Sequence, residues 1–512
     1  MYETKSSTLA NQCRIEGNLH YKERDFEMAI ESYNSCILNS CFASDSYVKC
    51  LGNKSAVLFE MHEYDKAATV IQFIKSLDYD FEKDYSEKLD KRLAACMAKT
   101  QNVVSSVQDG VEVNSLFGSR KISTITESGM GRSVVASESF VPNEKVLCVE
   151  PFAAVLGYDS WSTYCYTCFI YNADSIIVPC EGCPEVQYCS LKCRNDDKVH
   201  QTVECQQIDE IKDLGLMHLT IRVLYKISNE SAMFINSQLE LDLKEVSSQL
   251  PLDSPEKDVL ELHQISKVKS VLLEESLDSP AKIVKSFPQF STTNLDKIEV
   301  LLATVTSQLV NNASTIINHS LTLGNSPIGS GIYPQIALMN HSCYSNTMCL
   351  FNGKVATVKT TQAIPAHQQL FNSYGCDFEN HDKAERQERL FSQYDFLCLC
   401  QPCKEDWTRD ATVRSAVCQA CLASISITLS TATCSNCDTS LALILEKMQM
   451  LEERYNLAYD LYQKKSYQAA CDYLTNTEAG FDVNSFLNMP DALLLDWNDL
   501  IKKCLVAMHI VG

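Results

Sequence analysis

The first hundred residues place hydrophobic side chains at helical spacing, and part of their pattern occurs twice. Phe26 and Tyr64 stand 38 residues apart, and so do Ala29 and Ala67. Small residues at matching positions let neighbouring helices approach closely. We therefore predict helical repeats over residues 1–105, with a third helix pair that includes Lys88–Met97.

A polar stretch, residues 101–110, is predicted to be a linker, and beyond it the hydrophobic period changes. Strands are predicted at Val111–Val113, Arg132–Ala136, Lys145–Glu150 and within 332–374, and helices in 207–310 with a loop in the acidic, Ser-rich part near 245–295. From about Leu441 the pattern is that of amphipathic helices to the end, and Tyr467 and Ala470 repeat the spacing of the first region. This mixture predicts an α+β chain of several domains.

Length, composition and charge narrow the class of protein. A chain of 512 residues, 45% hydrophobic and 21% charged, fits a folded protein of about three domains. It has no run of 18 apolar residues and no basic-then-apolar leader, so we expect no membrane span and a reducing compartment. The net charge of −21 argues against direct nucleic-acid binding and suits basic protein partners, although solubility alone would also explain it.

The 25 cysteines favour metal ligands over disulfides in such a compartment. The first cluster offers eight ligands, enough for two tetrahedral zinc ions: Cys165, Cys168, Cys180, Cys183, Cys189, Cys193, His200 and Cys205. A second group, Cys398, Cys400 and Cys403, is one ligand short, and three packed cysteines are its alternative explanation. A third, Cys418, Cys421, Cys434 and Cys437, has zinc-ribbon spacing. No site needs an open position, so all are predicted to be structural, and most remaining cysteines to be small buried hydrophobes.

Two motifs point to a reaction. Residues 340–343 are Asn-His-Ser-Cys, and Ser373-Tyr374 follows about thirty residues later. This pair resembles the signature of SET lysine methyltransferases, and Tyr188-Cys189-Ser190 within the first cysteine cluster resembles the MYND zinc finger. The order of all these segments resembles the SET-and-MYND (SMYD) methyltransferases, and the repeats and the run 384–396 resemble their fourth-member branch, which bears tetratricopeptide (TPR) repeats.

The resemblance implies a SET β-fold core with a MYND finger and a helical insertion, flanked by N- and C-terminal TPR-like helical domains. The corresponding segments are 1–105 for the TPR-like repeats, 110–160 and 311–396 for the two parts of SET, 161–206 for MYND, 207–310 for the insertion, 397–440 for the post-SET zinc and ribbon region, and 441–512 for the C-terminal helices.

The resemblance also implies the metal pairing. In the finger, Cys165, Cys168, Cys189 and Cys193 would hold one zinc ion, and Cys180, Cys183, His200 and Cys205 the other. Cys343 would complete the site of Cys398, Cys400 and Cys403, which gives four ions with the ribbon. The family usually leaves three residues between the histidine and the last cysteine of the finger, and this chain has four.

S-Adenosylmethionine is the implied cofactor. A lysine amine with a pKa near 10.4 must be neutral to accept its methyl group, so an apolar channel and close alignment are needed. By resemblance, Tyr374 is catalytic and lies against the cofactor, whose other contacts are Gly129, Gly131, Arg132, Asn312, Asn340, His341 and Phe396. Three positions depart from the family: Ser345 stands where proline is usual, and Gln368 and Gln369 stand where many members have acidic residues.

The resemblance suggests several partners besides a protein substrate such as a histone. The MYND finger would bind proline-rich corepressor peptides, and the repeats would bind the acidic C-termini of Hsp90 or Hsp70 chaperones through Arg14, Asn18, Asn53, Lys88 and Arg92. The rival hypothesis is a non-catalytic adaptor that uses only these surfaces. In either case we expect the protein in the cytoplasm and nucleus.

Overall fold

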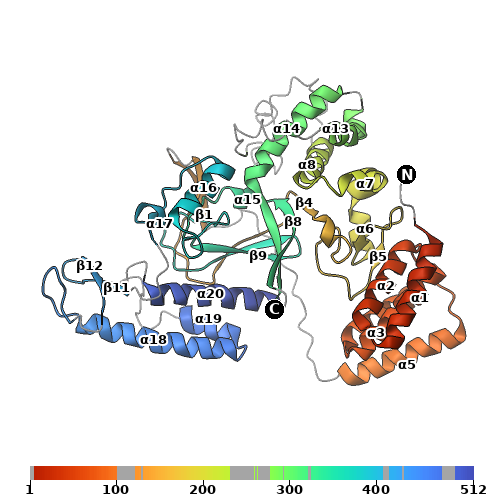
Figure 1. Ribbon diagram of the computed structural model, residues 1–512, viewed down its shortest axis with the longest axis horizontal. Helices are drawn as coiled ribbons and strands as arrows, with labels where there is room; N and C mark the ends of the chain where they lie inside the picture. Colours follow the sequence, from red (N-terminus) through yellow and green to blue (C-terminus); the bar gives the residue numbers. More distant parts are fainter. Residues whose placement is uncertain are drawn as a thin grey trace. The chain divides into compact units, whose positions relative to one another are not determined.

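The structure is a computed structural model that describes residues 5–100, 121–127, 131–230, 259, 262, 277–291, 293–320, 324–407, 414–428, 432–475 and 491–511 (Figure 1). The chain divides into two compact units. The first holds residues 1–107, 151–316 and 327–332, and the second holds 108–150, 317–326 and 333–512. No helix among the described residues combines the length and apolar character needed to cross a bilayer.

The predicted helical repeats form the start of the first unit. They are α1 (Ser7–Glu23), α2 (Phe26–Asn39), α3 (Asp45–Glu60), α4 (Tyr64–Ser76) and α5 (Lys83–Thr100), drawn in red to orange in Figure 1. The side chains of Ser6, Asp25 and Ser44 accept hydrogen bonds from the first turns of α1, α2 and α3 and so fix where these helices begin. Successive helices pack against one another, which confirms the helical period found in the sequence.

Two glycines allow the close packing within the repeats. A Cβ atom at Gly17 would lie 2.6 Å from the Tyr33 ring, and one at Gly52 would lie 1.9 Å from the Tyr85 hydroxyl oxygen. Both distances are impossible for real atoms, so each aromatic ring lies where only a glycine leaves room. Glycine at positions 17 and 52 therefore has a packing reason.

The zinc-finger region follows in the first unit and is short of regular structure. It contains β5 (Val178–Pro179), β6 (Gln187–Tyr188), α6 (Leu191–Asp196) and a π-helix over His200–Glu204, with 3₁₀ turns at Tyr158–Ser160 and Cys205–Gln207. Its loop before β5 packs into the helical repeats, because Ile177 is fully buried within their core.

A buried lysine anchors that loop. Lys54 Nζ on α3 donates to the Ala173 carbonyl at 2.6 Å and to Asn34 Oδ1 at 2.9 Å. Lys66 adds an ion pair with Asp174 at 2.7 Å. Burial lowers the pKa of Lys54 to about 7. The repeats and the finger therefore share one core.

The helical insertion completes the first unit. It contains α7 (Ile208–Ile211), α8 (Leu216–Glu230), α13 (Asp278–Lys285), a 3₁₀ turn at Pro288–Phe290 and α14 (Leu295–Asn312). The loop prediction for 245–295 is wrong where the structure describes it, because α13 forms there and buries Ile283 and Val284 against its neighbours. Strands β4 (Ala153–Leu156), β8 (Gly324–Ile332) and β7 (Ala313–Ser320) form a sheet in that order.

The second unit contains most strands of the expected SET core and the C-terminal helices. Strand β1 (Ile122–Glu127) pairs antiparallel with β2 (Gly131–Ala136), and β3 (Lys145–Val149), β10 (Val355–Thr360) and β9 (Thr347–Asn352) form an antiparallel sheet in that order. The predicted strands at 132–136 and 145–150 are confirmed, whereas 101–113 lies outside the described residues.

Helices cover and extend this unit. They are α15 (Pro334–Ala337), α16 (Lys383–Tyr394) and α17 (Gln401–Lys404), then the ribbon strands β11 (Ser415–Val417) and β12 (Ser424–Ser426), and the blue helices α18 (Ala442–Gln463), α19 (Tyr467–Thr475) and α20 (Ala492–Val511) (Figure 1). Leu350 of β9 is buried in one core with α18, α19 and α20. The predicted C-terminal helices are thus present and stabilise the sheet.

Candidate active site and metal centres

Two segments far apart in the sequence cross at the candidate active site. The Asn372 N–H donates to the Asn340 carbonyl at 2.9 Å, and the Ser342 N–H donates to the Asn372 carbonyl at 3.1 Å. His341 and Asn372 thus form a parallel bridge. The structure therefore brings the Asn-His-Ser-Cys loop beside the Ser-Tyr motif that follows it.

Tyr374 is held at this crossing by two hydrogen bonds. Its hydroxyl donates to the Met339 carbonyl at 3.0 Å, and its N–H donates to His341 Nδ1 at 3.1 Å. Burial raises the pKa of Tyr374 well above its usual range, so the phenol stays neutral at physiological pH. Burial also lowers the pKa of His341 to about 4, and its neutral ring contacts Cys343 Sγ through Nε2 at 3.3 Å.

An aromatic cluster surrounds these two side chains. The His341 ring centroid lies 5.3 Å from that of Tyr374 and 6.4 Å from that of Phe396. Tyr394, which the sequence did not assign to the site, packs against Tyr374 with the ring centroids 4.8 Å apart and the rings tilted by 39°. The only sequence signal for Tyr394 was its place two residues before Phe396 at the end of α16. The predicted residues His341, Tyr374 and Phe396 do lie together.

The other predicted cofactor contacts are distributed differently. Gly131 begins β2 with φ +74°, and a Cβ there would meet no atom within 4 Å, so space is open beside its backbone. Arg132 follows it, paired with Thr126 across the hairpin. Gly129 lies outside the described residues. Asn312 ends α14 in the first unit, where its side chain donates to the Gln308 carbonyl at 2.7 Å.

Asn340 lies within a polar chain. Its amide donates to Ser133 Oγ at 2.8 Å and to Gln369 Oε1 at 3.2 Å, and Gln369 in turn donates to the Glu127 carboxylate. The amide of Gln369 can accept from Asn340 and donate to Glu127 at once, whereas a carboxylate at 369 would face Glu127 with like charge. The neutral residue at 369 therefore has a structural reason.

Four groups of side chains are arranged as metal sites. In each group the four ligand atoms lie within 4.8 Å of one another. The groups are Cys165, Cys168, Cys189 and Cys193; Cys180, Cys183, His200 and Cys205; Cys343, Cys398, Cys400 and Cys403; and Cys418, Cys421, Cys434 and Cys437. They are the same sets that the sequence and the resemblance predicted.

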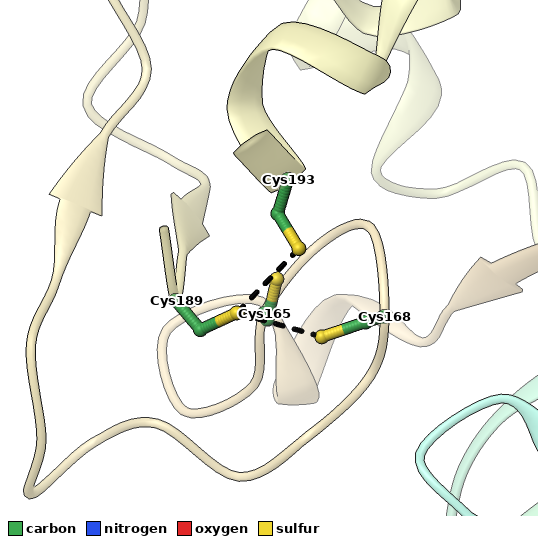
Figure 2. Close-up of side chains that lie close together, drawn as sticks. All are labelled: Cys165, Cys168, Cys189 and Cys193. Carbon is green, nitrogen blue, oxygen red and sulfur yellow. Dashed lines mark hydrogen bonds between the residues drawn. The ribbon is translucent and has the colours of Figure 1, made fainter. Parts of the chain in front are cut away.

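Sulfur spacing suits zinc. Thiolates about 2.3 Å from a tetrahedral zinc ion lie about 3.8 Å apart. Figure 2 shows the first finger site, where Cys189 Sγ lies 3.6 Å from Cys168 Sγ and 3.5 Å from Cys193 Sγ. In the post-SET group, Cys343 and Cys403 are 3.6 Å apart. The donor chemistry and the spacing thus fit four structural zinc ions.

One cysteine pair differs from expectation. Cys36 of α2 and Cys50 of α3 form a disulfide, whereas the sequence analysis treated the unclustered cysteines as buried hydrophobes. Both side chains are fully buried between the two helices. Proximity within the repeat core, which sequence spacing does not reveal, accounts for the pair.

The predicted peptide clamp of the repeats is largely engaged internally. Asn53 Nδ2 donates to Asn18 Oδ1 at 3.0 Å, and Arg92 Nη1 donates to the Gly52 carbonyl at 2.8 Å. Arg14 Nη2 donates to Asn11 Oδ1 at 2.8 Å, and Lys88 is exposed. These side chains therefore support the helices in the structure as described.

Comparisons with known proteins agree with the order of the sequence motifs. The SET domain family matches residues 131–375. Protein-lysine N-methyltransferase SMYD4 of Pongo abelii is 22% identical over 97% of this chain and 80% of its own length, and N-lysine methyltransferase SMYD2 of Homo sapiens is 27% identical over 54% of this chain and 58% of its own. Over almost its whole length the chain is thus similar to SMYD protein-lysine methyltransferases, with a SET domain match at its centre. A solved structure, the SET domain of LSMT bound to lysine and AdoHcy, covers 78% of this chain and 87% of its own at 12% identity, but its TM-score of 0.29 carries no argument.

The extra residue between His200 and Cys205 is accommodated by a π-helix. The Cys205 N–H bonds to the His200 carbonyl, five residues earlier, so the wider turn keeps both ligand side chains on one side. His200 Nε2 lies 3.3 Å from Cys180 Sγ and 3.5 Å from Cys183 Sγ. The longer interval therefore does not remove His200 from the site.

A buried carboxylate lies behind this histidine. Glu204 Oε2 is 3.6 Å from His200 Nδ1, and Glu204 accepts two hydrogen bonds at 2.7 Å from Arg222 and one at 2.8 Å from His218. Burial alone would raise the pKa of Glu204, but Arg222 and His218 hold it well below its usual range. This ionised side chain joins the zinc finger to α8 of the helical insertion.

Ser345, another departure from the pattern of the resembling family, leaves the neighbouring asparagine in place. Asn346 is buried, its amide donates to the Gln369 carbonyl at 2.9 Å, and its Oδ1 accepts from the Phe371 N–H at 2.7 Å. These two bonds fix the chain that leads to Tyr374. The loop therefore keeps its shape without the proline.

Proposed function

We propose that this protein is an S-adenosylmethionine-dependent protein-lysine N-methyltransferase that acts in the cytoplasm and nucleus on basic proteins such as histones, with a role in transcriptional regulation. The observation that carries the proposal is the fixed phenol of Tyr374 against the loop of Met339–His341. The net charge of −21 supports the choice of basic substrates.

The residues present fit such a cofactor. Open space beside the Gly131 backbone allows a close approach, and Asn340, His341 and Phe396 surround Tyr374 with polar and aromatic surface. Aromatic faces attract cationic groups such as a sulfonium. When bound, S-adenosylmethionine supplies an electrophilic methyl group.

The chain supplies position and environment for the transfer. The neutral Tyr374 hydroxyl, oriented by its bond to the Met339 carbonyl, keeps oxygen lone pairs for the reacting group. The half-buried rings of Tyr374, Tyr394 and Phe396 exclude water and disfavour a charged lysine, which lowers the pKa of its amine. Alignment then provides much of the rate.

The test combines binding and transfer. Calorimetry with S-adenosylmethionine should show binding at one site, and the purified chain should move labelled methyl groups to histones or another basic protein mixture. Tyr374→Phe should reduce transfer by at least about 100-fold with binding retained, because the hydroxyl acts in the reaction. Tyr473→Phe on α19 is a matched control that should leave transfer unchanged. Transfer by Tyr374→Phe at the unmodified rate would contradict the role of the phenol.

The second candidate is a non-catalytic adaptor. In this case, the finger would bind proline-rich corepressor peptides and the repeats would bind acidic chaperone tails. The core shared by the repeats and the finger favours the adaptor, since a peptide bound to the repeats could change the conformation of the finger, and the reverse. Cofactor binding without transfer to any protein, together with capture of an acidic chaperone tail that Lys88→Glu and Arg92→Glu abolish, would favour the adaptor.

A further inference from the structure

Arg386 is a buried charge whose surroundings lack an ordinary counter-ion. It lies in the first turns of α16, where a positive charge is unfavourable to the helix dipole, and its side chain is fully buried. Among the described residues, no carboxylate oxygen lies within 4.0 Å of its nitrogen atoms. A guanidinium in such a place needs another source of negative charge.

Its contacts point to the post-SET cysteines. Arg386 Nη1 donates to the His381 carbonyl at 2.6 Å, and Nη2 contacts the Pro402 carbonyl at 3.5 Å and Cys403 Sγ at 3.9 Å. Nε is buried without a hydrogen-bond partner. Two backbone carbonyl oxygens therefore hold the guanidinium group, and its Nη2 atom also faces the thiol of Cys403.

Charge balance explains the arrangement. A zinc ion bound by the four thiolates of Cys343, Cys398, Cys400 and Cys403 carries a net charge of −2. The single positive charge of the buried Arg386 guanidinium, at the edge of this group, would reduce the net charge from −2 to −1. Without the metal and its thiolates, the same arginine would be buried uncompensated.

The cluster also fixes the candidate active site. Cys343 is two residues after His341, whose Nδ1 accepts from the Tyr374 N–H. Cys398 is two residues after Phe396, which packs near His341. Whatever stabilises the metal therefore also stabilises the relative position of these three side chains.

We propose that Arg386 is the charge partner of a zinc tetrathiolate at Cys343, Cys398, Cys400 and Cys403, and that it thereby positions His341 and Tyr374 for the reaction. The positioning role rests on the proposed methyltransferase function, whereas the metal role does not. Arg386 is in this view a positioning residue, since nothing places it against the substrate or the cofactor.

The first test measures the metal site alone. In the zinc-loaded full chain, alkylation of each cysteine by iodoacetamide is followed by mass spectrometry, with total zinc determined in parallel. Arg386→Met, which keeps the length and removes the charge, should speed alkylation of the four post-SET cysteines at least tenfold and release one zinc ion per chain. Arg386→Lys should restore most of the protection, and Arg389→Met, an exposed arginine on the same helix, should behave like the unmodified protein.

Two results would overturn the metal role. One is equal alkylation of Arg386→Met and the unmodified chain. The other is faster alkylation at the finger and ribbon cysteines as well, which would reveal general loss of structure rather than a local charge effect. Neither result depends on the cofactor, so the outcome stands whether or not the protein transfers methyl groups.

The second test addresses positioning. Calorimetry with S-adenosylmethionine should show weaker binding by Arg386→Met, by at least tenfold, and rescue by Arg386→Lys. If the unmodified chain binds and Arg386→Met binds equally well despite losing zinc, positioning is refuted. If the unmodified chain does not bind the cofactor at all, the proposed function fails and the alkylation result still decides the metal role.

Discussion

The two all-cysteine sites of the second unit are built in opposite ways. The post-SET site joins Cys343 to three cysteines more than fifty residues later, and three of its four side chains are buried. The ribbon site takes all its ligands from residues 418–437, and its Cys437 is exposed. A metal shared by distant segments holds a tertiary crossing together, whereas a metal held by one hairpin stabilises mainly that hairpin.

The largest expected effect tests this difference directly. Cys343→Ser should lose one zinc ion and reduce methyl transfer by about 100-fold, because the loop beside Tyr374 is no longer tied to the post-SET segment. Cys434→Ser should also lose one zinc ion but keep transfer within about threefold. Metal analysis and a transfer assay check both, and equal losses of transfer would remove the distinction.

Accessibility offers a second contrast. A chelator such as EDTA should empty the ribbon at least about ten times faster than the post-SET site, since thiol reactivity follows exposure. Site-resolved alkylation during the reaction gives the order in which cysteines appear. Release of the post-SET zinc first would show that burial does not govern the order.

Asn346 also joins two distant segments, through hydrogen bonds and without a metal, and so extends the comparison of the two zinc sites. Asn346→Ala should lower the free energy of unfolding by about 2–4 kcal/mol, because it leaves the Gln369 carbonyl and the Phe371 N–H without their bonds. Asn352→Ala, at the exposed end of β9, should cost less than about 0.5 kcal/mol. Urea unfolding measures both. Similar small values would mean that the zinc ion, and not Asn346, provides most of the stability where the two segments meet.

The smallest expected effect is a pH dependence of stability, and it concerns Lys54, which joins the repeats to the finger in the first unit. Since the pKa of Lys54 falls from 10.5 to about 7 on folding, the unfolded chain binds more protons between these values. Stability should therefore rise with pH above about 7, by up to about 1.4 kcal/mol per pH unit, and show no such slope below it.

Lys54→Met should remove this slope, because methionine cannot bind a proton. Hydrogen exchange of α3 amides at pH 7, 8 and 9 follows the first unit by itself. Asp174 and Lys66 act on Lys54 in opposite directions, so Lys66→Met serves as the control and should keep a slope of the same sign. A slope in Lys54→Met equal to that of the unmodified chain would assign the pH dependence to other groups.

Local patterns were enough to predict much of this molecule. The helices between residues 7 and 100 follow from their hydrophobic period, and the cysteine groups follow from ligand spacing within short loops. Cys343 could be assigned only by resemblance, since its partners lie far along the chain. The roles assigned to Asn312, Arg132 and the peptide clamp stay predictions.

The buried charged residues could not be predicted from the sequence. Glu204, Arg386 and Lys54 look like surface residues when only their types are known. Their partners come from α8, from α17 and from the finger loop, and only the tertiary structure brings these together. Tyr394 was missed for the same reason, as its ring position depends on how α16 ends.

The widened turn at His200–Glu204 has a practical consequence for finding related fingers. Adding one residue between two ligands did not misplace either of them, because the backbone absorbed it as a bulge. A search template that fixes the interval at three would therefore overlook chains like this one. Templates that accept three or four residues would retrieve them.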